Sequence, residues 1–300
     1  MPDNDFSNEI MSLKNSYTTD FVTSKDGTKI GYRQLGSGAG LLLVHGGMMS
    51  SQNFMKLGKH LSGKFTVYIP DRRGRGLSGD HGDNYCLTAE SDDLLAIIKK
   101  TKAENIFGLS SGAIVVLQTA LVEPCVKKIA LYEPPIPVNG TEPAAWVAGY
   151  EHAMAEGNLG KAMISIVKGT GDNSLLGKLP GFMTIPFMNF AIKADAKDKE
   201  GNGKNEVSLK TLISTMHFDP KLVSQSDDII TNCKNLGAEV LLMGGQKSQQ
   251  YLKAALDALN FALPKLKRIE LKGVGHLAAD NGGNPNVVAK ELSNFFDSNH

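Results

Sequence analysis

Residues 108–112 read "GLSSG", a pair of serines between two glycines. The apolar run "NIFGLS" (105–110) before them predicts a short buried strand, and the residues after them have the pattern of a buried helix. A serine at a sharp strand-to-helix turn needs neighbours without side chains, which Gly108 and Gly112 provide. The stretch therefore predicts that Ser110 stands in a strained turn at the carboxyl edge of a sheet, where ligands bind in open α/β folds.

Short apolar runs alternate with helical patterns along the rest of the chain. Helices are expected over residues 88–102 and 249–263, and a hairpin is expected around the Asp-Gly turn at residues 26–27. Runs that are apolar on both faces are typical of strands in a parallel sheet. We therefore expect an α/β fold with a doubly wound, mostly parallel sheet. The further runs are "LLLVHG" (41–46), "FTVYIPD" (65–71), "KKIALYEP" (127–134), "AEVLLMGG" (238–245) and "KRIELKG" (267–273).

One segment interrupts this alternation. Residues 135–226 contain no clear buried strand and have mostly helical character, and they are too many for a loop. We interpret them as a helical cap inserted into a discontinuous core made of residues 17–134 and 227–300. Residues 1–16 are polar and are expected to form a flexible N-terminal segment.

Composition excludes several classes of function. Lys and Arg number 32 against 31 Asp and Glu, so no strong field attracts nucleic acid or an anionic membrane. The three cysteines are far apart and form no metal-binding or redox motif, which favours free thiols in a reducing compartment. Neither a signal peptide nor a membrane-spanning run is apparent, so we expect a cytoplasmic protein. We expect no metal and no organic cofactor, and the oligomeric state is left open.

A serine nucleophile needs a general base and donors for the negative charge that develops on the substrate oxygen. His276 follows the last predicted strand on a glycine-rich loop, "GVGH", which suits it to be the base. The backbone N–H of Ser111 at the start of a helix is one expected donor to an oxyanion. A second donor is expected in "VHGGMM" (44–49), from Gly47 or alternatively from Met48.

Other residues have weaker claims to a role in the site. His45 is expected to form structural hydrogen bonds, and His217 is a candidate for the lining of a pocket under the cap. The apolar string "GFMTIPFMNF" (181–190) is expected either to roof the pocket, which favours a hydrophobic or aromatic substrate, or only to pack within the cap.

Four motifs together resemble the α/β-hydrolase superfamily: "VHGG", "DRRGRGLS" (71–78), "GLSSG" and "GVGH", in this order. The resemblance extends from about Tyr17 to the end of the chain. It implies that the Asp and Arg residues of 71–78 brace loops. It also implies an acid after the seventh strand, usually an Asp in a G-x-x-D pattern.

The chain departs from this pattern at the acid. The aligned position in "GGQKS" is Ser248, which cannot supply a negative charge. Glu133, just past the sixth strand, lies on the same edge of the predicted sheet, where some superfamily members place their acid. We therefore expect Glu133 to orient His276, with a group such as Ser248, a carbonyl or water as the alternative. Weaker candidates for the acid are Asp219, Asp227 and Asp228.

These expectations point to a serine hydrolase that cleaves a small hydrophobic or aromatic ester or lactone. One alternative is a small-molecule binding or signalling protein on the same fold. Another alternative is a C–C bond hydrolase or a perhydrolase that uses the same three residues.

Overall fold

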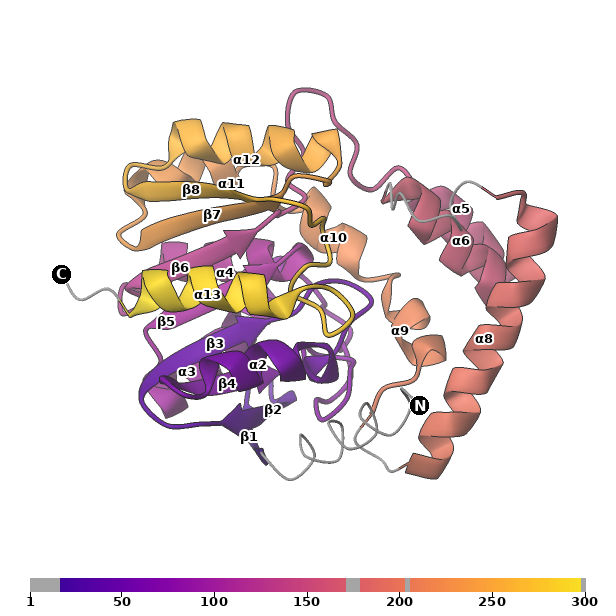
Figure 1. Cartoon of the computed structure of the whole chain (residues 1–300), viewed down its shortest axis with the longest axis horizontal. Coiled ribbons are helices and arrows are strands. Elements are labelled where there is room, and N and C mark those ends of the chain that lie inside the picture. The colour runs from indigo at the N-terminus through magenta and orange to yellow at the C-terminus, as the bar shows by residue number, and fades with distance from the viewer. Residues whose placement is uncertain (1–16, 171–178, 203–205, 298–300) are drawn as a thin grey trace.

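A single eight-stranded sheet organises the protein (Figure 1). The computed structural model describes residues 17–170, 179–202 and 206–297, so the expectation for residues 1–16 lies outside the described part. The strand order is β1-β2-β4-β3-β5-β6-β7-β8, in which the first two pairings are antiparallel and all others are parallel. The strands are β1 (Thr18–Thr23), β2 (Lys29–Leu35), β3 (Ala39–Val44), β4 (Phe65–Pro70), β5 (Asn105–Leu109), β6 (Lys128–Tyr132), β7 (Glu239–Gly245) and β8 (Leu266–Leu271).

Helices cover both faces of this sheet, which confirms the predicted α/β fold class. One apolar core joins α3, α4, α11 and α12 to the sheet, and a second core joins α2 and α13 to the opposite face. The bounds are α2 (Met55–Leu61), α3 (Leu87–Thr101), α4 (Ser111–Val122), α11 (Ile229–Asn232), α12 (Gln250–Ala262) and α13 (Pro285–Phe296), with short 3-10 helices η1 (Ser51–Phe54) and η2 (Cys233–Asn235).

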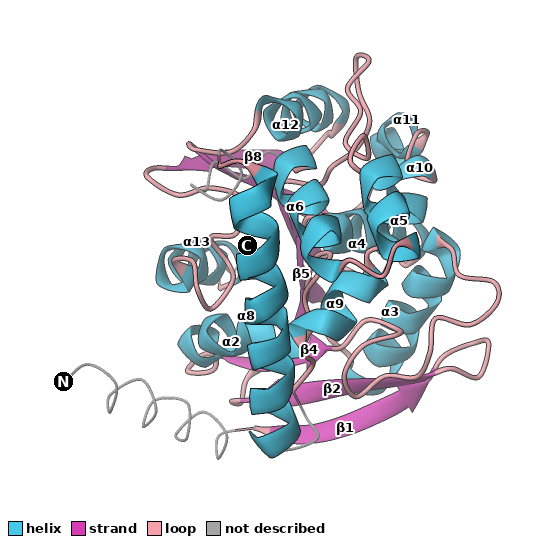
Figure 2. Ribbon diagram, turned by 90° about the vertical axis from the view of Figure 1, so that its right-hand side faces the viewer, coloured by secondary structure: helices cyan, strands magenta, loops and turns pink. Residues whose placement is uncertain are grey.

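Between β6 and β7 the chain leaves the sheet and forms a helical insertion with its own apolar core (Figure 2). Trp146, Tyr150 and Met216 are buried in this core. The exact division into core and cap at residues 135 and 226 stays a prediction. The insertion contains α5 (Val147–Ala155), α6 (Leu159–Gly169), α8 (Gly181–Asn202), α9 (Leu209–Thr215) and α10 (Asp219–Ser224).

Burial differs from the sequence expectation at the edge of the sheet. The run at 267–273 does form a strand, β8, but β8 pairs only with β7 and exposes Lys267, Arg268 and Glu270. Its alternating polar residues are therefore typical of an edge strand and not of a strand buried on both faces. Among the described residues, no helix combines the length and the apolar character that a membrane span requires.

Candidate active site

Ser110 stands at the turn between β5 and α4, in a backbone conformation that few residues adopt. Its φ is 56° and its ψ is −128°, and it is the N-cap residue of α4. The two flanking glycines are required by close backbone contacts. A Cβ at Gly112 would lie 2.4 Å from the carbonyl oxygen of His45, and one at Gly108 would lie 2.6 Å from the Cα of Ala113. The predicted strained turn is thus present, with the space for it made by glycine.

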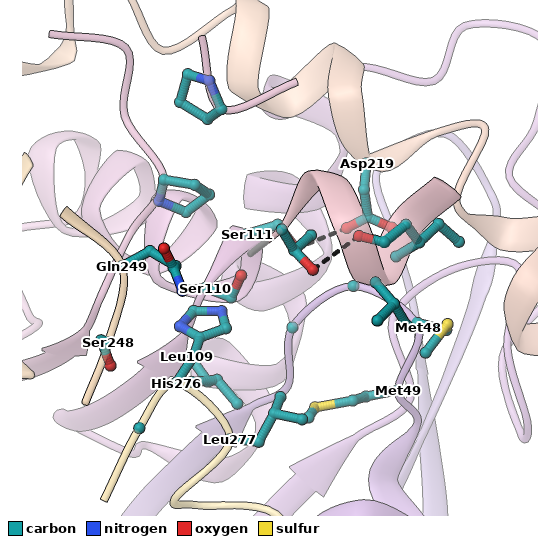
Figure 3. Close-up of a pocket in the computed structure, with 18 of the residues that line it drawn as sticks. Met48, Met49, Leu109, Ser110, Ser111, Asp219, Ser248, Gln249, His276 and Leu277 are labelled. Carbon is teal, nitrogen blue, oxygen red and sulfur yellow. Dashed lines mark hydrogen bonds between the residues drawn. The ribbon is translucent and has the colours of Figure 1, made fainter. Parts of the chain in front are cut away.

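Ser110 lines a pocket of about 620 Å³ between the sheet edge and the insertion (Figure 3). Most of the lining is apolar, and the roof comes from α6 and from the residues next to α5 and α9. No residue of 181–190 lines this pocket, so of the two alternatives for this string, the roof over the pocket is wrong. Instead α8 packs one face on α6 and exposes Phe182, Phe187 and Phe190 on the other. The main apolar lining residues are Met48, Trp146, Met163, Ile166, Val167 and Met216.

His276 and Glu133 are brought together at this pocket from segments 143 residues apart. The Nδ1 atom of His276 lies 2.7 Å from Oε2 of Glu133, and the Glu133 side chain is fully buried. The second carboxylate oxygen, Oε1, accepts a hydrogen bond of 2.6 Å from the backbone N–H of Gly245 at the end of β7. The loop that carries His276 is held in turn by the hydroxyl of Tyr132, which donates to the Gly275 carbonyl at 2.8 Å.

Ser248, at the position that the superfamily pattern gives to an acid, also lines the pocket but does not hold His276. Its hydroxyl oxygen is buried and has no hydrogen-bond partner within the described residues. Of the two groups that the sequence left in competition, Glu133 is therefore the one in contact with the imidazole.

The turn after β3 lies against Ser110. A Cβ at Gly46 would be 3.0 Å from the Cβ of Ser110, so the backbone of this turn passes directly beside the serine. In the described part of the chain, neither the N–H of Gly47 nor that of Ser111 donates to a protein group. Both residues line the pocket, so both donors are available to a ligand there. Met48, the alternative donor, follows with a positive φ of 53°.

The hydroxyl of Ser110 forms no hydrogen bond with any described residue, although His276 lines the same pocket. The hydrogen bond between a catalytic side chain and its general base is often long in ligand-free enzymes and shortens when substrate binds. The Nδ1–H of His276 donates to Glu133, which leaves Nε2 as the acceptor on this ring.

The other candidate histidines and acids do not lie where they could take part in catalysis. His45 is fully buried, with Nδ1 2.9 Å from the Gly46 carbonyl and Nε2 accepting the Arg72 N–H. Burial, and then the charges of Arg75 and Arg72, hold the pKa of His45 well below its usual range. His217 binds Glu151 on the surface of the insertion and does not line the pocket. Asp227 and Asp228 are likewise exposed and outside it.

The arginines of 71–78 are buried and hold charged partners from distant segments. Arg73 forms a two-bond contact with Asp93 on α3, at 2.6 and 2.7 Å. Arg72 forms a similar contact with Glu90. These contacts agree with the role in bracing loops that the resemblance implied for this motif.

Sequence reasoning missed the position of Asp219. This residue begins α10, and its carboxylate is buried beside the Ser110 turn, where it accepts hydrogen bonds from Ser111, Arg72 and Arg75. Burial raises the pKa of the Asp219 carboxyl, but the charges of the two arginines outweigh this and hold it far below its ordinary value. Only the Asp-Pro pair that begins a helix is visible in the sequence, and that signal does not indicate a long-range contact.

Comparison with known proteins supports the assignment of the fold. The family described as the α/β hydrolase fold matches residues 41–156. A 2-(acetamidomethylene)succinate hydrolase of Mesorhizobium japonicum is 25% identical over 89% of this chain and 91% of its own length. An α/β hydrolase of Sphaerobacter thermophilus superposes with a TM-score of 0.72 at 25% identity, covering 92% of this chain and 100% of that one. The enol-lactonase of Burkholderia xenovorans shares the fold at 16% identity, with a TM-score of 0.68 over 93% of this chain and 100% of that one.

The sheet order, the strained turn after β5 and these matches agree with one another. The chain has the α/β-hydrolase fold, and its sequence matches the family of that name over residues 41–156. It is a hydrolase of this fold.

Proposed function

We propose that this protein is a serine hydrolase that cleaves an ester or lactone through an acyl-enzyme. The single observation that carries the proposal is the contact between Nδ1 of His276 and the buried Glu133 carboxylate, at the pocket where Ser110 stands in its strained turn. This contact fixes the tautomer of the ring and leaves Nε2 free to accept the Ser110 proton.

In the proposed mechanism, His276 removes the proton of Ser110 as the hydroxyl attacks the carbonyl carbon of the substrate. The N–H groups of Ser111 and Gly47 stabilise the oxyanion of the tetrahedral intermediate. His276 then gives the proton to the leaving oxygen, and the carbon–oxygen bond breaks. Water repeats the sequence on the acyl-enzyme and restores Ser110. Throughout, the Glu133 carboxylate balances the positive charge of the imidazolium.

The pocket supports a small substrate with an apolar acyl group. Trp146, Met163 and Ile166 lie among a lining that is mainly apolar, and the volume of about 620 Å³ suits a compact molecule. Polar side chains of the lining include those of Ser110 and His276, where the chemistry is expected.

A panel of p-nitrophenyl esters and of lactones, with acyl groups of increasing size, tests this proposal. We expect turnover of at least one short apolar member and its loss in Ser110→Ala. The same panel includes 2-(acetamidomethylene)succinate, because the relative of that name is 25% identical to this chain. No turnover of any ester or lactone would contradict the proposal.

The same experiment distinguishes the proposed function from two alternatives. Tight binding of a ligand without turnover would favour a binding or signalling protein. Cleavage of a carbon–carbon bond or formation of a peracid, with esters left intact, would favour a different reaction of the same three residues.

A further inference from the structure

Asp219 is contributed by the helical insertion, yet its carboxylate lies in the core next to the Ser110 turn. The Ser111 hydroxyl donates to Oδ1 of Asp219 at 2.6 Å, and Nη1 of Arg72 donates to the same oxygen at 3.0 Å. Nη2 of Arg75 donates to Oδ2 at 2.5 Å. Figure 3 shows Asp219 and Ser111 joined in this way beside the pocket.

The same carboxylate also lies close to Gly47, the residue of the second expected donor. A Cβ at Gly47 would lie 3.2 Å from both Cγ and Oδ1 of Asp219, and equally close to the sulfur of Met216. Asp219 therefore binds the Ser111 side chain and lies beside Gly47, and the N–H groups of these two residues have no acceptor within the described part of the protein. No other acidic side chain lines the pocket as described.

The charges around Asp219 indicate what it contributes. A lone carboxylate here would repel the negative oxygen of a tetrahedral intermediate, but Arg72 and Arg75 neutralise it. Arg72 in turn is paired with Glu90, so the buried cluster holds two positive and two negative groups. Because these charges balance, the contribution of Asp219 lies in the geometry that its hydrogen bonds fix.

We propose that Asp219 is a positioning residue of the active site. It holds the Ser111 hydroxyl and packs beside Gly47, so that the backbone N–H groups of Ser111 and Gly47 converge on the substrate oxygen. Through it the inserted helices help to build the oxyanion hole of the core. This inference rests on the proposed function, because the oxyanion hole has meaning only for an acyl-transfer enzyme.

The proposal is tested with Ser111→Ala, Asp219→Asn and the double variant, on an ester that the wild type cleaves. Ser111→Ala removes the hydroxyl that binds Asp219 but keeps the backbone N–H. We expect kcat to fall about tenfold in Ser111→Ala and about 10- to 100-fold in Asp219→Asn, with KM changed less than about threefold. Because both changes act through one contact, the double variant should be no slower than Asp219→Asn alone.

A matched control is Asp93→Asn, which also removes a buried carboxylate from an arginine of the 71–78 loop but lies outside the pocket. It should lower Tm and leave the kcat of the folded enzyme unchanged.

Several results would overturn the proposal. One is a wild-type kcat in Ser111→Ala, which also decides the matter if Asp219→Asn does not fold. Another is a fall in the activity of Asp219→Asn that matches only its loss of folded protein. A third is multiplication of the two losses in the double variant. If the wild type neither cleaves an ester nor reacts at Ser110, the proposed function fails together with this inference. If the wild type cleaves an ester and the variants cleave it equally fast, the proposed function stands and only the role of Asp219 is rejected.

Discussion

The imidazole of His276 is held by Glu133, a carboxylate at the end of β6, and Ser248 after β7 takes no part in holding it. The backbone supports this arrangement: Gly245 N–H, at the end of β7, donates to the second oxygen of Glu133. Strand β7 therefore contributes a peptide donor to the site, and the negative charge comes from the neighbouring strand.

Exchange of Glu133 for Gln tests this relationship directly. The amide oxygen of Gln can still accept from Gly245, but its NH₂ group would face the Nδ1–H of His276 and favour the wrong tautomer. We expect kcat to fall roughly 10²- to 10⁴-fold, as when a triad acid is replaced by its amide.

The matched control is Ser248→Ala, which should change kcat less than about threefold because its hydroxyl has no partner in the described structure. A loss of kcat in Glu133→Gln that is as small as the loss in Ser248→Ala, measured on the same ester, would show that the acid lies elsewhere.

The close contact between Gly112 and the His45 carbonyl, behind the Ser110 turn, predicts that a side chain at residue 112 destabilises the fold. In Gly112→Ala the new methyl carbon would lie 2.4 Å from the His45 carbonyl oxygen, so backbone must move. We expect a loss of about 3 kcal/mol in the free energy of unfolding, together with lower kcat, since overpacking of a well-packed core costs ~1–3 kcal/mol.

Gly63→Ala provides the comparison, since a Cβ there has no atom within 4 Å. Its effect should stay within about 0.5 kcal/mol. Urea denaturation of both variants measures the difference, and equal stability would mean that the turn is not packed as described.

The buried side chain of His81 is expected to make the folded protein less stable at acidic pH. It is stacked on Phe218 of the insertion, 3.6 Å between ring centroids, and burial followed by the charge of Arg75 lowers its pKa to about 4. An unfolded histidine titrates near 6.5, so between these values the unfolded state binds more protons and the folded state loses stability as pH falls. The loss is expected to be on the order of 2 kcal/mol between pH 6.5 and 4.

His81→Phe keeps an aromatic ring against Phe218 and removes the titrating group. Its unfolding free energy should therefore decline less than that of the wild type between pH 6.5 and 4. The same decline in both proteins would assign the acid sensitivity to other groups.

Much of the fold could be predicted because its signals are local. The buried strands β3 to β7 are short apolar runs, and the Gly108 and Gly112 pair marks the turn at Ser110. Strand β8 was predicted to exist, but its position at the edge depends on strand order, which the local pattern does not encode.

The site was less predictable where it depends on contacts across the chain. Glu133 could be named because it follows a strand, and every parallel strand ends at the same edge. By contrast, Asp219 reaches Ser111 from 108 residues away, and no local pattern specifies that pairing. For the apolar string that begins α8, the sequence left a roof over the pocket and packing within the cap as alternatives, because apolar residues alone do not show which surface they will cover.

Ser110 is the proposed nucleophile, and covalent labelling with a fluorophosphonate followed by peptide mass spectrometry tests this role. We expect one adduct on Ser110, no adduct in Ser110→Ala, and slower labelling at Ser110 in Ser111→Ala. An unlabelled wild type, or an adduct that persists at this site in Ser110→Ala, would contradict it.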